Sequence, residues 1–152
     1  MDLSPKGDPP GFVRILDDKT LAIPDRPGNR RLDTLHNVLE QPQVGLMFLV
    51  PGRGEVLRVS GAAQIITDPD LMATMAIAER PPTLALVVTI DEVMFHCGKS
   101  VIRSKLWSPD EWPDIEGLAS YAECLGDQTT SDETVAQMEV RFGSWHDGNE
   151  LY

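Results

Sequence analysis

Apolar positions follow a strand-like period or form short apolar runs in five stretches of the chain, which predicts β-strands. The third run is almost wholly apolar, which favours a buried strand. Gly61 interrupts the fourth run and predicts a bulge or bend. The five runs are residues 12–16, 20–23, 44–50, 55–67 and 84–97.

A spacing of three to four residues between apolar side chains predicts helices. In the first helix Asn29 is the expected N-cap, Leu32, Leu35 and Leu39 recur on one face, and Pro42 stops the helix. We therefore expect antiparallel strands with a few peripheral helices and a C-terminal helical tail, a mainly β, α+β or barrel arrangement. The further helices are expected at residues 68–80, 98–107, 115–125 and 131–142.

Three arginines, Arg26, Arg30 and Arg31, lie in the loop before the first helix and in its expected first turn. A helix N-terminus already carries partial positive charge, so arginine there is unfavourable unless an anion lies nearby. Free backbone N–H groups and guanidinium groups together suit a phosphate ester. The loop predicts a phosphate site, and the alternative is a solvated basic loop.

A second cationic pair, Lys99 and Arg103, lies one turn apart on one face of the helix expected at 98–107. The pair predicts a contact with a cofactor phosphate or a substrate anion, and the alternative is a solvated helix face. His96, at the end of the last strand, is either a ligand contact or a structural residue.

The formal net charge of −11 over 152 residues is unevenly distributed. Residues 1–107 contain 13 acidic and 12 basic residues, whereas residues 108–152 contain 11 acidic residues and one basic residue, Arg141. We therefore divide the chain into a domain at 1–113 and an acidic helical extension at 114–152. Nucleic-acid binding needs a broad basic surface, so a nucleic-acid partner is not expected.

No apolar run is long enough to span a bilayer, and no basic-then-apolar secretory start is present, so we expect a cytoplasmic protein without a membrane partner. Cys97 and Cys124 lack a paired spacing, which indicates neither a disulfide framework nor zinc. His36, His96 and His146 have no ligand spacing either, and we expect no metal site.

Several motifs, in this order, resemble the pyridoxamine 5′-phosphate oxidase-like flavoproteins, which are split β-barrels that bind FMN at a dimer interface. Each motif alone is weak, but their order and spacing are fairly specific. The resemblance covers residues 4–112, and its last two motifs resemble one uncharacterised branch of the family. The motifs are SPKGDP at 4–9, IPDRPGNRR at 23–31, VGLMFLVPG at 44–52, LRVSG at 57–61, FHCGKS at 95–100 and IRSKLW at 102–107.

The resemblance implies that FMN is contacted by the segment 4–7, by a strand end at Ile23 and Pro24, and through its phosphate by Arg30 and Arg31. The argument for an anion site adds Arg26 and Asn29 of the loop and the second cationic pair, Lys99 and Arg103. The candidate cofactor-binding residues are Ser4, Pro5, Lys6, Gly7, Ile23, Pro24, Arg26, Asn29, Arg30, Arg31, Lys99 and Arg103.

The chain departs from the family pattern in three respects. Relatives have a helix and a first barrel strand before the position of Ser4, so we expect this chain to lack both. Val56 lies near a position where the oxidases proper carry a glutamine that hydrogen-bonds the flavin, which implies a different ring environment. The residues that hold pyridoxamine phosphate are not recognisable, so vitamin B6 chemistry is not implied.

The expected function is that of a homodimeric FMN-dependent oxidoreductase with a small-molecule substrate and the cofactor at the dimer interface. The pattern identifies no catalytic acid or base. The alternative is a non-catalytic split-barrel module that binds FMN or another phosphorylated ligand, or the same fold with haem or a deazaflavin.

Overall fold

The computed structural model describes residues 2–28 and 31–146. The chain divides into two compact units, Met1–Pro109 and Asp110–Tyr152. The first unit contains the whole β-sheet, and the second contains two helices packed against each other. Within the described ranges, no helix is both long enough and apolar enough to cross a membrane.

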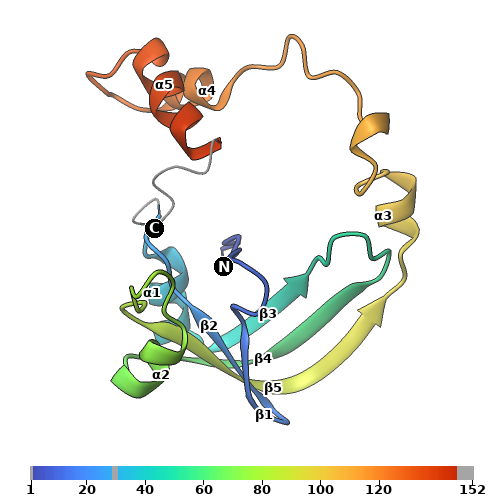
Figure 1. The fold of residues 1–152 in the computed structure, drawn as a ribbon, viewed down its shortest axis with the longest axis vertical. Coiled ribbons are helices and arrows are strands. Elements are labelled where there is room, and N and C mark those ends of the chain that lie inside the picture. Colours follow the sequence, from blue (N-terminus) through green and yellow to red (C-terminus); the bar gives the residue numbers. More distant parts are fainter. Residues whose placement is uncertain (1, 29–30, 147–152) are drawn as a thin grey trace. The chain divides into compact units, whose positions relative to one another are not determined.

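The first unit is built on a five-stranded antiparallel sheet (Figure 1). The strands are β1 (Arg14–Asp17), β2 (Thr20–Pro24), β3 (Gln43–Phe48), β4 (Val56–Ile66) and β5 (Ala85–His96). Their order in space is β1-β2-β5-β4-β3, so β1 and β3 are the edges. The long strands β4 and β5 pair along their whole length. The expected α+β class with antiparallel strands is confirmed.

Two helices cover the sheet, one on each face: α1 (Asp33–Glu40) and α2 (Pro69–Thr74). The buried cluster under α1 contains Leu86, and the cluster under α2 contains Ala85. Successive residues of a strand point to opposite faces, so the two helices lie on opposite sides of β5. The clusters are Val38, Ala63, Leu86 and Val88 under α1, and Ala22, Met72, Met75 and Ala85 under α2.

The bulge predicted at Gly61 is confirmed. The pairing of β4 with β5 shifts its register between Ser60 and Gly61. A Cβ at Gly61 would lie 2.1 Å from the carbonyl oxygen of Thr89 on β5, closer than any side chain tolerates. Glycine is therefore required where the two central strands approach each other.

Helix α1 begins later than the sequence predicted. Its N-cap is Leu32, which makes no side-chain capping bond, and Asn29, the predicted cap, lies outside the described residues. The first turn contains Asp33, whose negative charge is favourable at a helix N-terminus. Arg31 precedes the helix, so the expectation that this arginine lies within the first turn is wrong.

Two other elements differ from the prediction. β3 is an edge strand whose residues alternate between exposed and half-buried, so the expectation of a buried strand is wrong. α2 is capped as predicted by Asp68, whose carboxylate accepts from the N–H of Leu71 at 2.8 Å. The helix ends at Thr74, whereas the sequence predicted that it would continue to residue 80. Ala78 has a φ of 47°, in the left-handed region that a helix cannot include.

In the second unit, α4 (Tyr121–Gln128) packs against α5 (Val135–His146). A short 3₁₀ helix, η1 (Pro109–Glu111), lies at the boundary between the two units in the sequence. Both α4 and α5 begin later than the predicted positions 115 and 131. Ser120 sets the start of α4: its hydroxyl accepts from the N–H of Glu123 at 3.1 Å, and the Glu123 carboxylate accepts from the N–H of Ser120 at 2.6 Å. The buried residues between the helices are Ala122, Met138 and Phe142.

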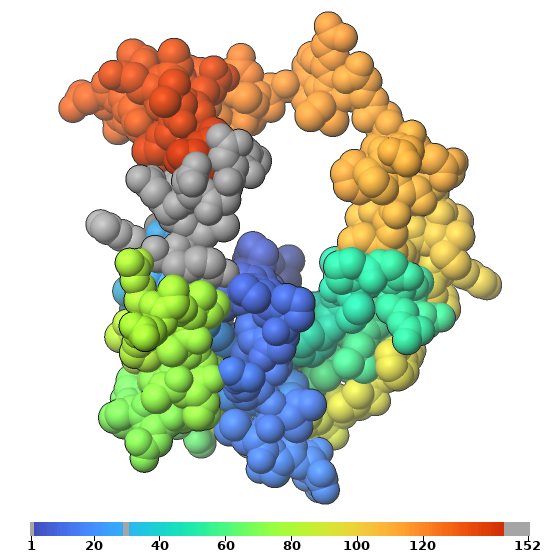
Figure 2. All heavy atoms as spheres, viewed as in Figure 1, coloured from blue at the N-terminus to red at the C-terminus, as the bar shows by residue number. Residues whose placement is uncertain are grey.

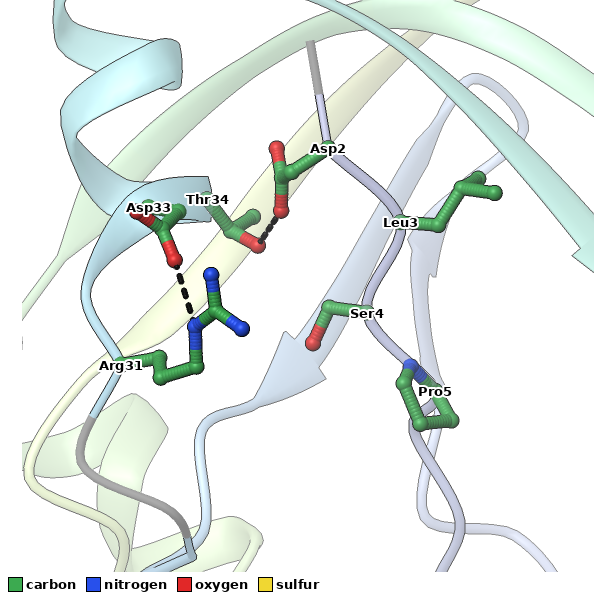
Figure 3. A pocket seen from close by; sticks show the side chains of 7 residues that line it. All are labelled: Asp2, Leu3, Ser4, Pro5, Arg31, Asp33 and Thr34. Carbon is green, nitrogen blue, oxygen red and sulfur yellow. Dashed lines mark hydrogen bonds and ion pairs between the residues drawn. The ribbon is translucent and has the colours of Figure 1, made fainter. Parts of the chain in front are cut away.

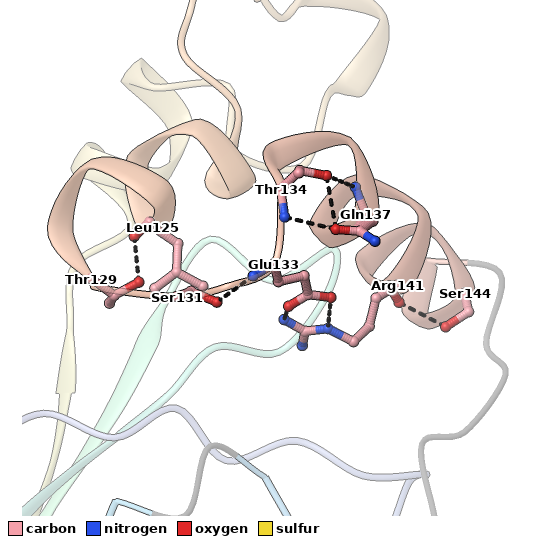
Figure 4. Close-up of polar contacts among 8 residues, drawn as sticks. All are labelled: Leu125, Thr129, Ser131, Glu133, Thr134, Gln137, Arg141 and Ser144. Atoms are coloured by element: carbon pink, nitrogen blue, oxygen red, sulfur yellow. Dashed lines mark hydrogen bonds and ion pairs between the residues drawn. The ribbon is translucent and has the colours of Figure 1, made fainter.

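Thr134 and Gln137 set the start of α5 by a similar reciprocal contact (Figure 4). The Gln137 side-chain oxygen accepts from the N–H of Thr134 at 2.8 Å, and the Thr134 hydroxyl accepts from the N–H of Gln137 at 3.3 Å. Arg141 donates to both carboxylate oxygens of Glu133, at 2.8 and 3.1 Å, and these bonds lower the pKa of Glu133. This contribution to stability is therefore present at neutral pH and is lost as the pH falls through the lowered pKa.

Candidate functional site

The N-terminal segment, residues 2–11, has no regular structure and is fastened to the first unit by charged side chains. Figure 2 shows the start of the chain, in dark blue, at the surface of the first unit. On β1, which follows this segment, Arg14 Nη2 donates to the Thr74 carbonyl at the end of α2 at 2.6 Å. The anchors of the segment itself are Asp2 on Thr34 and Asn37, Lys6 on Asp25 at 2.8 Å, and Asp8 on Arg26 at 2.6 Å.

These anchors bring Ser4 and Pro5 next to the start of α1, where a polar hollow of about 250 Å³ lies between the two segments (Figure 3). We call it the N-terminal hollow. Three positions from the candidate cofactor-binding set, Ser4, Pro5 and Arg31, meet here although the chain separates them widely. The lining residues are Asp2, Leu3, Ser4, Pro5, Arg31, Asp33 and Thr34.

Arg31 supplies the guanidinium group of this hollow. Its Nε donates to the Asp33 carboxylate at 2.9 Å, and 74% of the Arg31 side chain and 54% of the Asp33 side chain are exposed. Solvent-exposed ion pairs contribute little, because water screens the attraction and two side chains lose freedom. An anion with two negative charges can therefore compete with Asp33 for Arg31.

Asp2 places a second carboxylate in the N-terminal hollow. It accepts hydrogen bonds from the Thr34 hydroxyl and from Asn37 Nδ2, the latter at 2.6 Å. These two bonds hold the pKa of Asp2 below its ordinary value of 3.8. The carboxylate is therefore ionised at neutral pH, and the docking of Asp2 on α1 weakens only as the pH falls through that lowered pKa.

Arg26 lies inside the anchoring contacts and does not line the N-terminal hollow. Its Nε donates to Asp8 at 2.6 Å and its Nη2 donates to the Met75 carbonyl at 2.7 Å. The Arg26 side chain is 16% exposed and that of Asp8 only 2% exposed. The arginine thus ties the N-terminal segment to the end of α2, and we leave it out of the proposed phosphate ligands.

We expect Asp8→Ala to lower the free energy of unfolding by about 2 kcal/mol, because the partly buried Arg26 guanidinium loses a charged partner. Urea denaturation followed by circular dichroism measures the change. Asp25→Ala is the matched control: it removes the more exposed partner of Lys6 and should shift the transition far less. Equal transitions for the two variants would contradict the anchoring role of Arg26.

The other candidate positions lie outside the N-terminal hollow. Lys6 pairs with Asp25, and Gly7 has no atom within 4 Å of an added Cβ. Ile23 and Pro24 are buried in β2, which lies between β1 and β5. Asn29 and Arg30 lie outside the described residues.

Lys99 and Arg103 lie on α3 (Lys99–Arg103), beside a second hollow of about 500 Å³ that we call the α3 hollow. It lies where the end of β3, the start of β4 and the end of β5 meet. His96 Nε2 lies 3.4 Å from Arg58 Nη1 at its margin. The lining residues are Met47, Leu49, Val56, His96, Cys97, Lys99, Ser100, Val101, Arg103, Ser104 and Leu106.

The backbone fixes α3 against the turn that joins β3 to β4. A Cβ at Gly98 would lie 2.7 Å from the carbonyl carbon of Gly54, so only glycine allows this approach. Trp107 Nε1 donates to the Arg53 carbonyl at 2.6 Å on the same turn. Lys99 and Arg103 are therefore held by a short, well-anchored helix.

The two hollows lie toward opposite ends of the sheet, as the positions of α1 and α3 show in Figure 1. On β4, Val56 lines the α3 hollow and Ala63 packs under α1. These two residues are about 23 Å apart at the usual rise of a strand. One protomer therefore does not bring its own two cationic sites together.

The comparison with known families bears on what these hollows bind. The sequence profile of the pyridoxamine 5′-phosphate oxidase family matches residues 2–97. The chain belongs to this family. The match includes the N-terminal segment, the arginine loop and all five strands, and the antiparallel sheet is consistent with the split β-barrel expected of a member. The family match ends at residue 97, before Lys99 and Arg103, so it does not bear on this cationic pair.

Two solved structures, both of the HupZ protein of Group A Streptococcus, are similar to this family member. One is a histidine-to-alanine variant with 18% identity, covering 56% of this chain and 73% of HupZ at a TM-score of 0.44. The other structure also has 18% identity and a TM-score of 0.44, and the match covers 55% of this chain and 68% of HupZ. Scores this low support no inference about the ligand. No curated protein matches the chain.

Sequence reasoning missed the carboxylates and most of the apolar side chains of the two hollows. Asp33 and Thr34 lie two and three residues after Arg31, and this closeness in sequence was a signal for a local ion pair and a nearby hydroxyl. Asp2 gave no such signal, because its partners Thr34 and Asn37 are more than thirty residues away in sequence.

Proposed function

We propose that this member of the pyridoxamine 5′-phosphate oxidase family binds FMN through the N-terminal hollow and acts as an oxidoreductase on a small-molecule substrate. One observation carries the proposal: Ser4, Pro5 and Arg31 line the same hollow. The family resemblance assigns FMN to these same positions.

The donors present in the hollow fit a phosphate ester. Arg31 offers guanidinium N–H groups, and Ser4 offers a hydroxyl. The exposed Arg31–Asp33 pair is weak, so exchange of Asp33 for a phosphate is favourable when the ligand is doubly charged. We propose Arg30 as the second guanidinium on the family resemblance alone, because it lies outside the described residues.

In this proposal the chain binds and orients the cofactor. Arg31 and Ser4 hold the phosphate, and the Lys6–Asp25 and Asp8–Arg26 pairs keep segment 4–7 in place beside it. FMN, when bound, supplies the redox chemistry, because its ring accepts a hydride and passes the electrons to an acceptor. No side chain of the described residues is assigned as a catalytic acid or base.

We propose further that the protein is a homodimer with the cofactor at the interface. Large exposed apolar side chains lie near the ends of β3 and β5, on the segment that follows β3, and on α3, and such patches mark association surfaces. Because the two hollows of one protomer lie apart, a dimer can bring the α3 hollow of one copy near the N-terminal hollow of the other. The exposed side chains are Met47, Leu49, Val50, Val93, Met94, Phe95 and Ile102.

We expect Phe95→Asp to weaken dimerisation at least about 100-fold, because Phe95 is 71% exposed and would place a charge in the apolar contact. Light scattering on a sizing column measures the mass. Ile15→Asp is the matched control, since Ile15 is 79% exposed on the opposite edge strand, β1. A monomeric wild type, or a dimer that survives Phe95→Asp, would contradict the proposed interface.

The function is tested by purifying the full chain and recording its visible absorption. A flavin spectrum, with NAD(P)H oxidation in the presence of an electron acceptor, supports the oxidoreductase. A flavin spectrum without turnover favours the non-catalytic binding module. A haem or deazaflavin spectrum, or no chromophore at all, would reject FMN.

A further inference from the structure

The two cations of the α3 hollow, Lys99 and Arg103, have no acidic partner among the described residues, unlike the three cations nearest the N-terminal segment. Lys6, Arg26 and Arg31 each contact a carboxylate. Within residues 2–28 and 31–146, Lys99 and Arg103 form no ion pair, and no aspartate or glutamate lines their hollow. Arg103 Nε donates to the Lys99 carbonyl at 3.2 Å.

The wall beside these cations is apolar. Met47 and Leu49 reach it from β3 and the residues that follow, and they remain 67% and 49% exposed. Val56, Val101 and Leu106 complete the wall. Methionine adapts its shape to different ligands, which suits a site for an organic molecule.

Size and chemistry together narrow the class of ligand. A hollow of about 500 Å³ lies within the range of small-molecule sites. Inorganic phosphate would use the two cations and leave the apolar wall in water. A neutral apolar molecule would cover the wall but gain nothing from the charges. An anion with an apolar body uses both, through charge-assisted hydrogen bonds and removal of apolar surface from water.

We propose that the α3 hollow binds an organic anion with an apolar body, whose carboxylate, phosphate or sulfonate group is held by Lys99 and Arg103. The two residues thus serve a ligand other than the FMN phosphate. The binding of this ligand does not depend on the proposed function. Its role as the substrate of the oxidoreductase does rest on that function.

The test uses two fluorescent probes with closely related ring systems, titrated into the full chain. Anilinonaphthalene sulfonate carries a negative charge, and phenylnaphthylamine is neutral. In the Lys99→Met/Arg103→Met variant, the sulfonate probe should bind about 30-fold more weakly, because two charge-assisted hydrogen bonds are lost. The neutral probe should change by less than about twofold, since methionine keeps the apolar stems.

Two further variants separate local from general effects. Lys19→Met removes an exposed cation from the turn between β1 and β2, away from the α3 hollow. It should leave the affinity for both probes unchanged, whereas Lys99→Met/Arg103→Met weakens binding of the sulfonate probe. Leu49→Ser should weaken both probes, because it removes part of the shared apolar wall. Urea denaturation confirms that each variant is folded as stably as the wild type.

Flavin content, measured on the same preparations, distinguishes the two proposals. Unchanged flavin with weaker sulfonate binding in Lys99→Met/Arg103→Met supports a separate anion site. Loss of flavin in that variant would assign Lys99 and Arg103 to the cofactor and overturn the proposal, as would unchanged sulfonate affinity. A wild type without flavin rejects the proposed function, while the probe titrations still decide whether this site exists.

Discussion

Replacement of Arg30 and Arg31 together by alanine is expected to weaken FMN binding about 100-fold or more, so that the purified protein retains no flavin. Each guanidinium can donate charge-assisted hydrogen bonds to phosphate oxygens. Arg31 precedes α1 and its side chain is 74% exposed, so its loss should leave the fold cooperative. Flavin absorbance per protein and a urea unfolding curve measure the two effects.

Asp33→Asn is the matched control for this variant, because it removes the negative charge of the Arg31–Asp33 ion pair and not the positive one. It removes the charge to which Arg31 Nε donates at 2.9 Å, and FMN affinity should rise. If the double arginine variant keeps its full flavin content, or if Asp33→Asn loses flavin, Arg31 does not hold the phosphate.

The second large effect is on stability, and it arises at Gly61. We expect Gly61→Ala to lower the free energy of unfolding by about 3 kcal/mol or more, because an overfilled site must move its neighbours. The added Cβ would meet the Thr89 carbonyl oxygen at 2.1 Å and the Thr89 carbonyl carbon at 2.9 Å. Both atoms belong to the backbone of β5, so no side-chain rotation relieves the contact. Chemical denaturation measures the loss.

Gly45→Ala is the control for Gly61→Ala. Gly45 lies on the edge strand β3, and no atom lies within 4 Å of a Cβ built there. Its replacement should change the free energy of unfolding by no more than about 0.5 kcal/mol. If Gly61→Ala is as stable as Gly45→Ala, the close approach of β4 and β5 at the bulge is wrong.

Local signals explain the parts of the fold that the sequence predicted well. Apolar runs predicted the strands, because β2, β3, β4 and β5 each place side chains against α1 or α2. The break at Gly61 gave the bulge, and Asp68 before a first-turn proline gave the start of α2. Each of these signals acts over a few residues and needs no knowledge of distant partners.

Other features depend on pairings that no local pattern encodes. An apolar run reads the same on an edge strand as in a sheet centre, so β3 was expected to be buried. Arg26 contacts Asp8 and the Met75 carbonyl, 18 and 49 residues away, and a cluster of arginines gives no sign of such partners. The apolar wall beside Lys99 and Arg103 also forms only when three strands meet.

The most direct test of the central claim, that the N-terminal hollow holds the phosphate of FMN, is a calorimetric titration of the flavin-free protein with FMN and with riboflavin. We predict that FMN binds about 100-fold more tightly, because riboflavin lacks the phosphate, and that this difference disappears in the Arg30→Ala/Arg31→Ala variant. Equal affinities in the wild type, or a preference for FMN that persists in the variant, would contradict the claim.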